Sequence, residues 1–116
     1  MSALQIEQQS DVTRLRLQGS LTIAEVTPLR QELLACLNEP GHATQNLVWD
    51  LASVTEADSA GVQLLTATSL WLQQRQVNSS VSACAAGLDM VARAVGAADD
   101  RQCCGFTRQQ DTGVTP

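Results

Sequence analysis

The sequence predicts an α/β domain in which a mixed β-sheet of four to five strands is covered by three to four helices, in the order β-β-α-β-α-β-α. Three observations carry this prediction. Two short segments near the start alternate apolar and polar residues, the run LVWDL at 47–51 is almost wholly apolar, and apolar residues then recur every three or four positions. Strand–helix–strand connections of this kind place parallel strands side by side.

The first two strands are predicted at residues 4–8 and 12–18. Each alternates between apolar and polar side chains, as a half-buried strand does. The polar connection at 9–11 is short enough for an antiparallel hairpin, and Gly19 is expected to end the second strand.

The first helix is predicted at residues 24–37, where leucines and a valine keep helical spacing. Thr22 is the expected N-cap, and Glu25, three residues later, completes a capping-box pattern. The sequence NEPG at 38–41 is typical of the end of a helix, and a loop is expected at 42–45.

The centre of the chain is a strand at 47–51, a polar turn at 56–61 and a helix at 60–74. Only Asp50 interrupts the apolar character of the strand, which indicates a central position in the sheet. Because functional sites of open α/β sheets gather at the carboxyl ends of central strands, the turn at 56–61 is the candidate site.

The remaining elements are a strand at 77–85 and a short helix at 88–95 that Gly96 closes. Residues 99–101 are expected to form a loop, and residues 103–106 either add a short last strand or pack against the core. We expect one domain at residues 1–107 and a flexible C-terminal tail at 108–116.

Composition narrows the class of protein. The 116 residues are 44% apolar, which suits one globular domain, and the net charge is -5. All seven basic residues are scattered arginines, so nucleic acid is not an expected partner. With neither a signal-peptide pattern nor an apolar run of roughly 20 residues, the expectation is a cytoplasmic protein without membrane insertion.

The four cysteines are expected to be free thiols in a reducing compartment. Cys36 and Cys84 fall inside a predicted helix and strand, whereas the adjacent Cys103 and Cys104 are poorly placed to bond to each other. One histidine and no C-x-x-C spacing give little support for zinc, so no metal and no cofactor is expected.

The sequence DSAG at 58–61 has three physical interpretations. Asp58 or Ser59 could cap the following helix. Ser59 could be a nucleophile, but Ala57 stands where a nucleophile elbow has glycine, and the base would have to be His42. Ser59 could instead be a phosphorylation site at the positive end of the helix dipole. The residue pattern alone leaves capping and phosphorylation both open.

Residues 47–62 resemble the signature of the STAS domain family, which includes the anti-sigma factor antagonists. The matching positions are Asp50-Leu51, Val54 and the sequence DSAGV at 58–62. The sequence LQGSL at 17–21 also resembles the L-x-G-x-L with which the second strand of the family ends. The resemblance covers about residues 3–106 and agrees with the predicted order of elements.

The resemblance implies a protein-interaction module and not an enzyme. Ser59 corresponds to the residue that a partner serine kinase phosphorylates, and that kinase binds the unphosphorylated form. The helix at 60–74 then supplies much of the docking surface. The expected partner-binding residues are Thr22, Glu56, Asp58, Ala60, Gly61, Val62, Leu64 and Thr68.

Two positions depart from the family pattern. Glu56 stands where an apolar residue is common, and Thr22 stands where an aspartate near the site is frequent. The second variant resembles stand-alone STAS proteins of chemotaxis-type signalling, whose kinase is therefore a candidate partner beside an anti-sigma factor. The alternative is a constitutive STAS subunit that docks on the ATPase of a lipid or ABC transport complex. We expect a monomer or a weak dimer.

Overall fold

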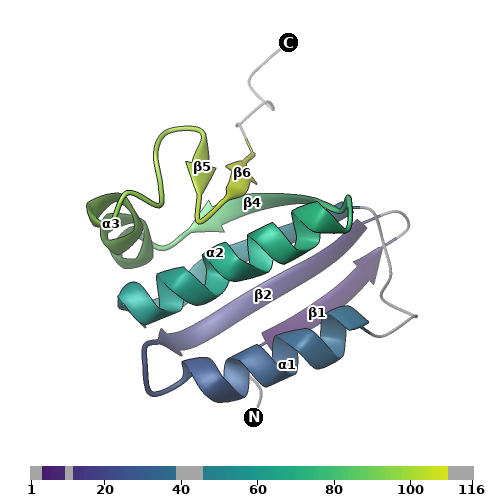
Figure 1. The fold of residues 1–116 in the computed structure, drawn as a ribbon, viewed down its shortest axis with the longest axis horizontal. Helices are drawn as coiled ribbons and strands as arrows, with labels where there is room; N and C mark the ends of the chain where they lie inside the picture. Colours follow the sequence, from purple (N-terminus) through teal and green to yellow (C-terminus); the bar gives the residue numbers. More distant parts are fainter. Residues whose placement is uncertain (1–3, 10–11, 39–45, 110–116) are drawn as a thin grey trace.

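The computed structural model describes residues 4–9, 12–38 and 46–109, which form one six-stranded sheet and three helices (Figure 1). The strands are β1 (Leu4–Gln9), β2 (Val12–Leu21), β3 (Asn46–Ala57), β4 (Asn78–Cys84), β5 (Gln102–Cys103) and β6 (Phe106–Arg108). The helices are α1 (Val26–Asn38), α2 (Ser59–Gln74) and α3 (Ala86–Ala94).

The strand order is β1-β2-β3-β4-β6-β5. Strands β2, β3, β4 and β6 are parallel, while β1 and β5 run antiparallel to their neighbours at the two edges. This confirms the mixed α/β fold and the helix count. The sheet has six strands instead of four to five because the C-terminal segment forms a hairpin, β5–β6, whose two-residue turn holds Cys104 and Gly105 at positive φ.

Helices α1 and α2 lie side by side on the same face of the sheet (Figure 1). The residues beneath them are apolar and in register, since Leu15 pairs with Trp49 and Trp49 pairs with Val81. The opposite face is polar, and on it Arg16 and Asp50 form an ion pair at 3.3 Å. One hydrophobic core therefore lies between the sheet and the helices.

Strand β3 is much longer than the predicted 47–51 and runs to Ala57. Its pairing with β2 shifts register twice, between Arg16 and Gln18 and between Gly19 and Ser20. Each shift inserts an extra residue in β3, so Leu51 and Val54 are both buried although they are three positions apart. The alternation that marks a strand in the sequence is lost at these bulges, and the predicted turn at 56–61 is mostly strand and helix.

The connection from β2 to α1 also differs from the prediction. Strand β2 continues past Gly19 to Leu21, and α1 begins at Val26 instead of residue 24. The Thr22 hydroxyl lies 3.3 Å from the hydroxyl of Ser20, and it is the Thr22 carbonyl oxygen that accepts from the backbone of Glu25 and Val26. The predicted capping box is therefore wrong, and residues 22–25 form a turn before the helix.

Several expectations fall on residues outside those that the structure describes, namely the middle of the turn at 9–11, the stop and loop after residue 38, and residues 110–116 of the tail. The last strand includes Arg108, one residue beyond the expected domain boundary, and the Gln109 N–H donates to the carbonyl of Val81. Among the described helices, none has the length and apolar character needed to cross a membrane.

Candidate functional site

The candidate site lies where β3 ends and α2 begins, and Asp58 is the single residue between them. Its backbone is extended, and its Oδ1 accepts hydrogen bonds from the N–H groups of Ala60 at 2.9 Å and Gly61 at 3.1 Å. These are two of the backbone donors that the first turn of a helix leaves free. Asp58, and not Ser59, is therefore the N-cap of α2.

The second oxygen of Asp58 reaches the neighbouring connection. Oδ2 accepts from the Ile23 N–H at 2.9 Å, and the Asp58 N–H donates to the Leu21 carbonyl at 3.2 Å. The hydrogen bond from Ile23, followed by those from Gly61 and Ala60, holds the pKa of Asp58 below its usual range despite some desolvation. Asp58 therefore ties the start of α2 to the segment between β2 and α1.

Gly61 lets α2 pack directly on the end of β2. A Cβ atom at Gly61 would lie 2.2 Å from the carbonyl oxygen of Leu21, so any larger residue would have to push backbone aside. The next residue, Val62, is 2% exposed. Both residues were expected at the partner surface, yet both face the core. Their role is to fix the position of α2 on the sheet.

Ser59 is the first residue of α2 and its side chain is exposed. Within the described part of the chain its hydroxyl has no hydrogen-bond partner. Glu56 is exposed nearby on β3, and the half-buried Asp58 and Ala60 flank the serine. The site thus presents a free hydroxyl at a helix N-terminus in acidic surroundings.

Ile23 is a residue of this site that the sequence analysis missed. Its side chain is 69% exposed, although its N–H is fixed by Asp58 and although the half-buried Thr22 precedes it. The only signal in the sequence is an apolar residue in the polar connection before the first helix. An exposed apolar side chain whose backbone is held in place by a hydrogen bond is suited to contact with another molecule.

Leu64 and Thr68, two further expected contact residues, lie on the side of α2 that faces α1. They line an apolar groove of about 150 Å³ between the two helices. The Thr68 hydroxyl donates to the Leu64 carbonyl at 2.8 Å. Because this bond occupies the hydroxyl, Thr68 contributes mainly its methyl group to the groove. The other lining residues are Arg30, Leu33, Leu34, Leu37, Ala67 and Trp71.

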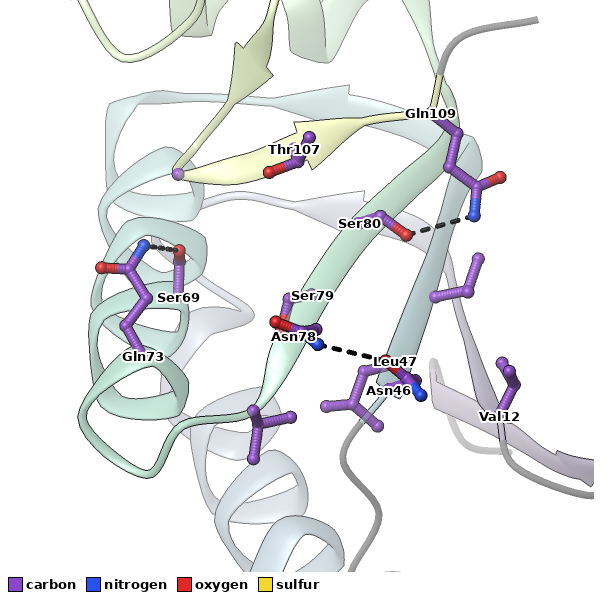
Figure 2. Close-up of a pocket in the computed structure, with 13 residues that line it drawn as sticks. Val12, Asn46, Leu47, Ser69, Gln73, Asn78, Ser79, Ser80, Thr107 and Gln109 are labelled. Atoms are coloured by element: carbon purple, nitrogen blue, oxygen red, sulfur yellow. Dashed lines mark hydrogen bonds between the residues drawn. The ribbon is translucent and has the colours of Figure 1, made fainter. Parts of the chain in front are cut away.

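A second cavity lies at the opposite end of the sheet, beside the amino ends of β3 and β4 (Figure 2). Its volume is about 440 Å³. Asn78 and Asn46 bond to each other at its mouth, and Ser69, Ser79 and Gln73 also line it. Amide, hydroxyl and apolar side chains line this cavity without a charged side chain, so its lining holds no carboxylate, histidine or thiol to act as a general acid, a general base or a strong nucleophile.

The interpretation of Ser59 as a nucleophile gains no catalytic partner from the described residues. His42, the expected base, lies outside them. The groups around Ser59 are carboxylates and backbone, and the oxygens of Asp58 are already engaged by three N–H groups.

The comparisons with known proteins agree with this fold. The model of the family described as "Mlab, STAS domain" matches residues 4–102. The structure of the anti-sigma factor antagonist SpoIIAA in its unphosphorylated form is similar, with a TM-score of 0.66 and 18% identity over 96% of this chain and 91% of that chain. No curated protein gives a significant match.

Two more solved structures share the fold. A Ser-to-Glu variant of RsbS from Moorella thermoacetica has a TM-score of 0.66 and 19% identity, over 95% of this chain and 88% of that chain. The crystal structure of Mglu has a TM-score of 0.55 and 26% identity, over 68% of this chain but only 19% of that chain. With the family match extending from β1 into β5, the chain belongs to the STAS domain family.

Proposed function

We propose that this protein is a protein-interaction module that docks through α2 and residues 22–25, and that phosphorylation of Ser59 switches the docking. The observation that carries the proposal is the exposed Ser59 hydroxyl, free of hydrogen bonds to described residues, at the first position of a helix whose cap is already supplied by Asp58. Capping does not need this serine, so its hydroxyl is available for modification. Membership of the STAS family supports the same assignment.

A phosphate on Ser59 would change the charge of the site more than its fold. It adds about -1.5 to -2 charges, which the helix dipole favours and the carboxylates of Asp58 and Glu56 oppose. The phosphate would also compete with Asp58 for the N–H groups of the first turn. Since Asp58 also holds the Ile23 N–H, the modification would disturb residues 22–25 together with the start of α2.

The proposed docking surface combines Ile23, Ser59 and the groove that Leu64 and Thr68 line. Along the helix axis Leu64 and Thr68 lie about 7–14 Å from Ser59, within two to three turns. Around the helix axis, however, Leu64 and Thr68 lie roughly 140° and 180° from Ser59, at about 100° per residue. A partner that extends from the groove over the N-terminus of α2 to Ile23 would contact the Ser59 side chain as well. The proposed partner is a serine kinase, of the anti-sigma factor or the chemotaxis type, that binds the unphosphorylated form. We assign the protein no catalytic activity and no cofactor in this role.

The proposal is tested with two variants and one control, each assayed for binding to the serine kinases of these two types encoded in the source genome. Ser59→Ala should bind as wild type and resist phosphorylation, and Ser59→Asp should bind at least tenfold more weakly. Ser53→Asp adds the same charge at an exposed serine of β3 outside the proposed surface and should bind as wild type. Equal binding by all three variants, with no phosphate on Ser59 in protein from its own cells, would refute the switch.

The apolar groove favours a second candidate, a constitutive subunit that docks on the ATPase of a lipid or ABC transport complex. A groove between two helices can hold a partner whatever the state of Ser59. This candidate predicts that Thr68→Arg releases the ATPase, that Ser59→Asp does not, and that Ser59 carries no phosphate in the isolated complex. Loss of binding in Ser59→Asp alone would favour the kinase-regulated switch.

A further inference from the structure

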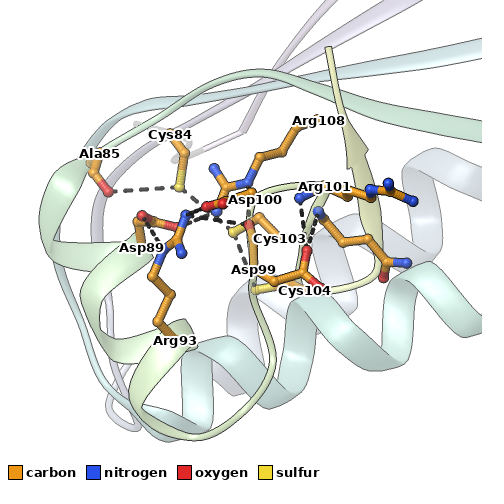
Figure 3. A network of polar contacts seen from close by, with 11 residues as sticks. Cys84, Ala85, Asp89, Arg93, Asp99, Asp100, Arg101, Cys103, Cys104 and Arg108 are labelled. Atoms are coloured by element: carbon orange, nitrogen blue, oxygen red, sulfur yellow. Dashed lines mark hydrogen bonds and ion pairs between the residues drawn. The ribbon is translucent and has the colours of Figure 1, made fainter. Parts of the chain in front are cut away.

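Cys84, Asp89 and Cys103 come from three different elements and converge at one place (Figure 3). Cys84 ends β4, Asp89 lies in the first turn of α3, and Cys103 ends β5. The sulfur atoms of Cys84 and Cys103 are 3.7 Å apart, and these sulfurs and a carboxylate oxygen of Asp89 all lie within 4.8 Å of one another. This cluster could not be predicted from the sequence, because the two cysteines are 19 residues apart.

The spacing of the ligand atoms fits a tetrahedral cation. Zinc binds thiolate sulfur at about 2.3 Å, which places two sulfur ligands of a tetrahedral site about 3.8 Å apart. The 3.7 Å between the sulfurs of Cys84 and Cys103 matches this separation. In such a site the zinc–oxygen distance of about 2.1 Å places a carboxylate oxygen about 3.6 Å from each sulfur. The Asp89 oxygen lies within 4.8 Å of both sulfurs, so a small movement of its side chain would complete the site.

The carboxylate of Asp89 is oriented by two arginines. Arg108 donates to its Oδ1, and Arg93 donates to its Oδ2 at 3.0 Å. Each carboxylate oxygen has a second lone pair, so both hydrogen bonds leave room for a metal bond. Hydrogen bonds of this kind fix ligating carboxylates in metal sites. The two arginines would also offset the negative charge of two thiolates and one carboxylate.

The site is closed on one side and open on the other. Cys103 is fully buried, and the sulfur of the equally buried Cys104 lies 3.9 Å from its sulfur. Cys84 and Asp89, in contrast, line an open cleft of about 420 Å³ together with Arg108. A metal ion has a path into the site through this cleft, and the cleft leaves the fourth coordination position to water or another small ligand.

We infer that Cys84, Cys103 and Asp89 form a site for one thiophilic divalent cation, best matched by Zn²⁺. Two sulfur ligands and one carboxylate favour zinc over magnesium or calcium, which prefer oxygen. Bound zinc would join β4, α3 and β5, and so would hold the two-residue strand β5 in place. The expectation of no metal, drawn from the lack of C-x-x-C spacing, did not anticipate this convergence.

The inference is tested on the full-length, reduced protein after chelator treatment. Titration with Zn²⁺ alone should show one bound ion per chain and a higher melting temperature, whereas Mg²⁺ should do neither. Co²⁺ in place of zinc should give thiolate-to-cobalt charge-transfer absorption and the visible bands of a tetrahedral site. Cys84→Ser should weaken zinc binding by about 100-fold, and Arg108→Gln by about 10- to 100-fold.

Cys36→Ser is the matched control, because Cys36 is a buried thiol of α1 outside the cluster, and it should bind zinc as wild type. Asp89→Asn, at a half-buried position, should fold and bind less tightly, which keeps the test independent of any loss of folding in a cysteine variant. The inference is overturned if the wild type binds less than one zinc per chain, if the cobalt spectrum lacks thiolate bands, or if Cys84→Ser binds as tightly as wild type.

Discussion

At the scale of single residues, Gly61 shows why the DSAG sequence needs its glycine. The residue lies in a helix, where glycine is normally unfavourable, but its missing Cβ is what lets α2 touch the Leu21 carbonyl. Gly61→Ala should therefore lower the free energy of unfolding by about 2–3 kcal/mol, because backbone must move to relieve the contact. Chemical denaturation of the purified variant measures this.

Gly87 is the control for that substitution, since it also lies in a helix and a Cβ there would meet no atom within 4 Å. Gly87→Ala should raise the free energy of unfolding by about 0.5–1 kcal/mol. If both alanine variants changed stability in the same direction, the close approach of α2 to β2 would not be the reason for Gly61.

Asp58 makes the stability of the protein depend on pH. Its pKa is lower in the folded state, chiefly through the hydrogen bond from Ile23, so its contribution to stability is present above its unfolded pKa near 3.8 and is lost as pH falls through the folded pKa. Asp58→Asn should lower the melting temperature at pH 7, because an amide cannot accept on both sides. The difference from wild type should shrink below pH 3.8. A difference that stayed constant down to pH 2 would contradict this account.

The residues of the site were predictable from the sequence only in part. Asp58 and Ser59 could be singled out because carboxylates and hydroxyls prefer helix starts, whatever the rest of the fold does. The exposed Ile23 could not, since its position depends on a hydrogen bond to a residue 35 positions away. The same applies to Cys84 and Cys103, which only the β5–β6 hairpin brings together.

At the scale of elements, the sequence predicted strands and helices where their periodicity is unbroken. It failed at β3, where two bulges shift the phase of the buried positions, so that a strand of 12 residues looked like one of five. It also left open the last strands, because β5 and β6 are too short to show any alternation. In both cases the strand is defined by its pairing with neighbouring strands, and this pairing leaves no regular alternation in the sequence.

Phe106 anchors strand β6 in the hydrophobic core. Its ring is fully buried and stacks on Trp49 of β3 with 5.0 Å between centroids. Phe106→Ala should lower the free energy of unfolding by about 3–5 kcal/mol through lost burial and the cavity that it leaves. Hydrogen exchange should speed up in β5 and β6 first. Met90→Ala, at a side chain that is 69% exposed, should change stability by less than about 0.5 kcal/mol.

At the scale of the whole molecule, the helices cover one face of the sheet and the other face is polar. Leu15, Trp49 and Val81 point to the helices. The opposite side carries mainly charged and hydroxyl side chains, with Val48 in register between Arg14 and Ser80. The sequence predicted this division for the strands that alternate. The polar face needs no second layer, and the proposed docking surface does not include it: that surface consists of α2, the groove beside α1 and the connection at 22–25.

This arrangement predicts that the protein is a monomer in solution. The polar face and a net charge of -5 oppose face-to-face pairing, and polar residues along β1 make that edge of the sheet a poor template for a second chain. The Cα radius of gyration is 13.4 Å, as expected for a single compact domain of this length. Small-angle scattering with light scattering should give the mass of one chain, 12.4 kDa, up to high micromolar concentration. A mass of twice that value for the wild type, but of one chain for a Thr68→Arg variant, would show instead that two copies pair through the groove between α1 and α2. A partner would then compete with a second copy of the chain for the groove.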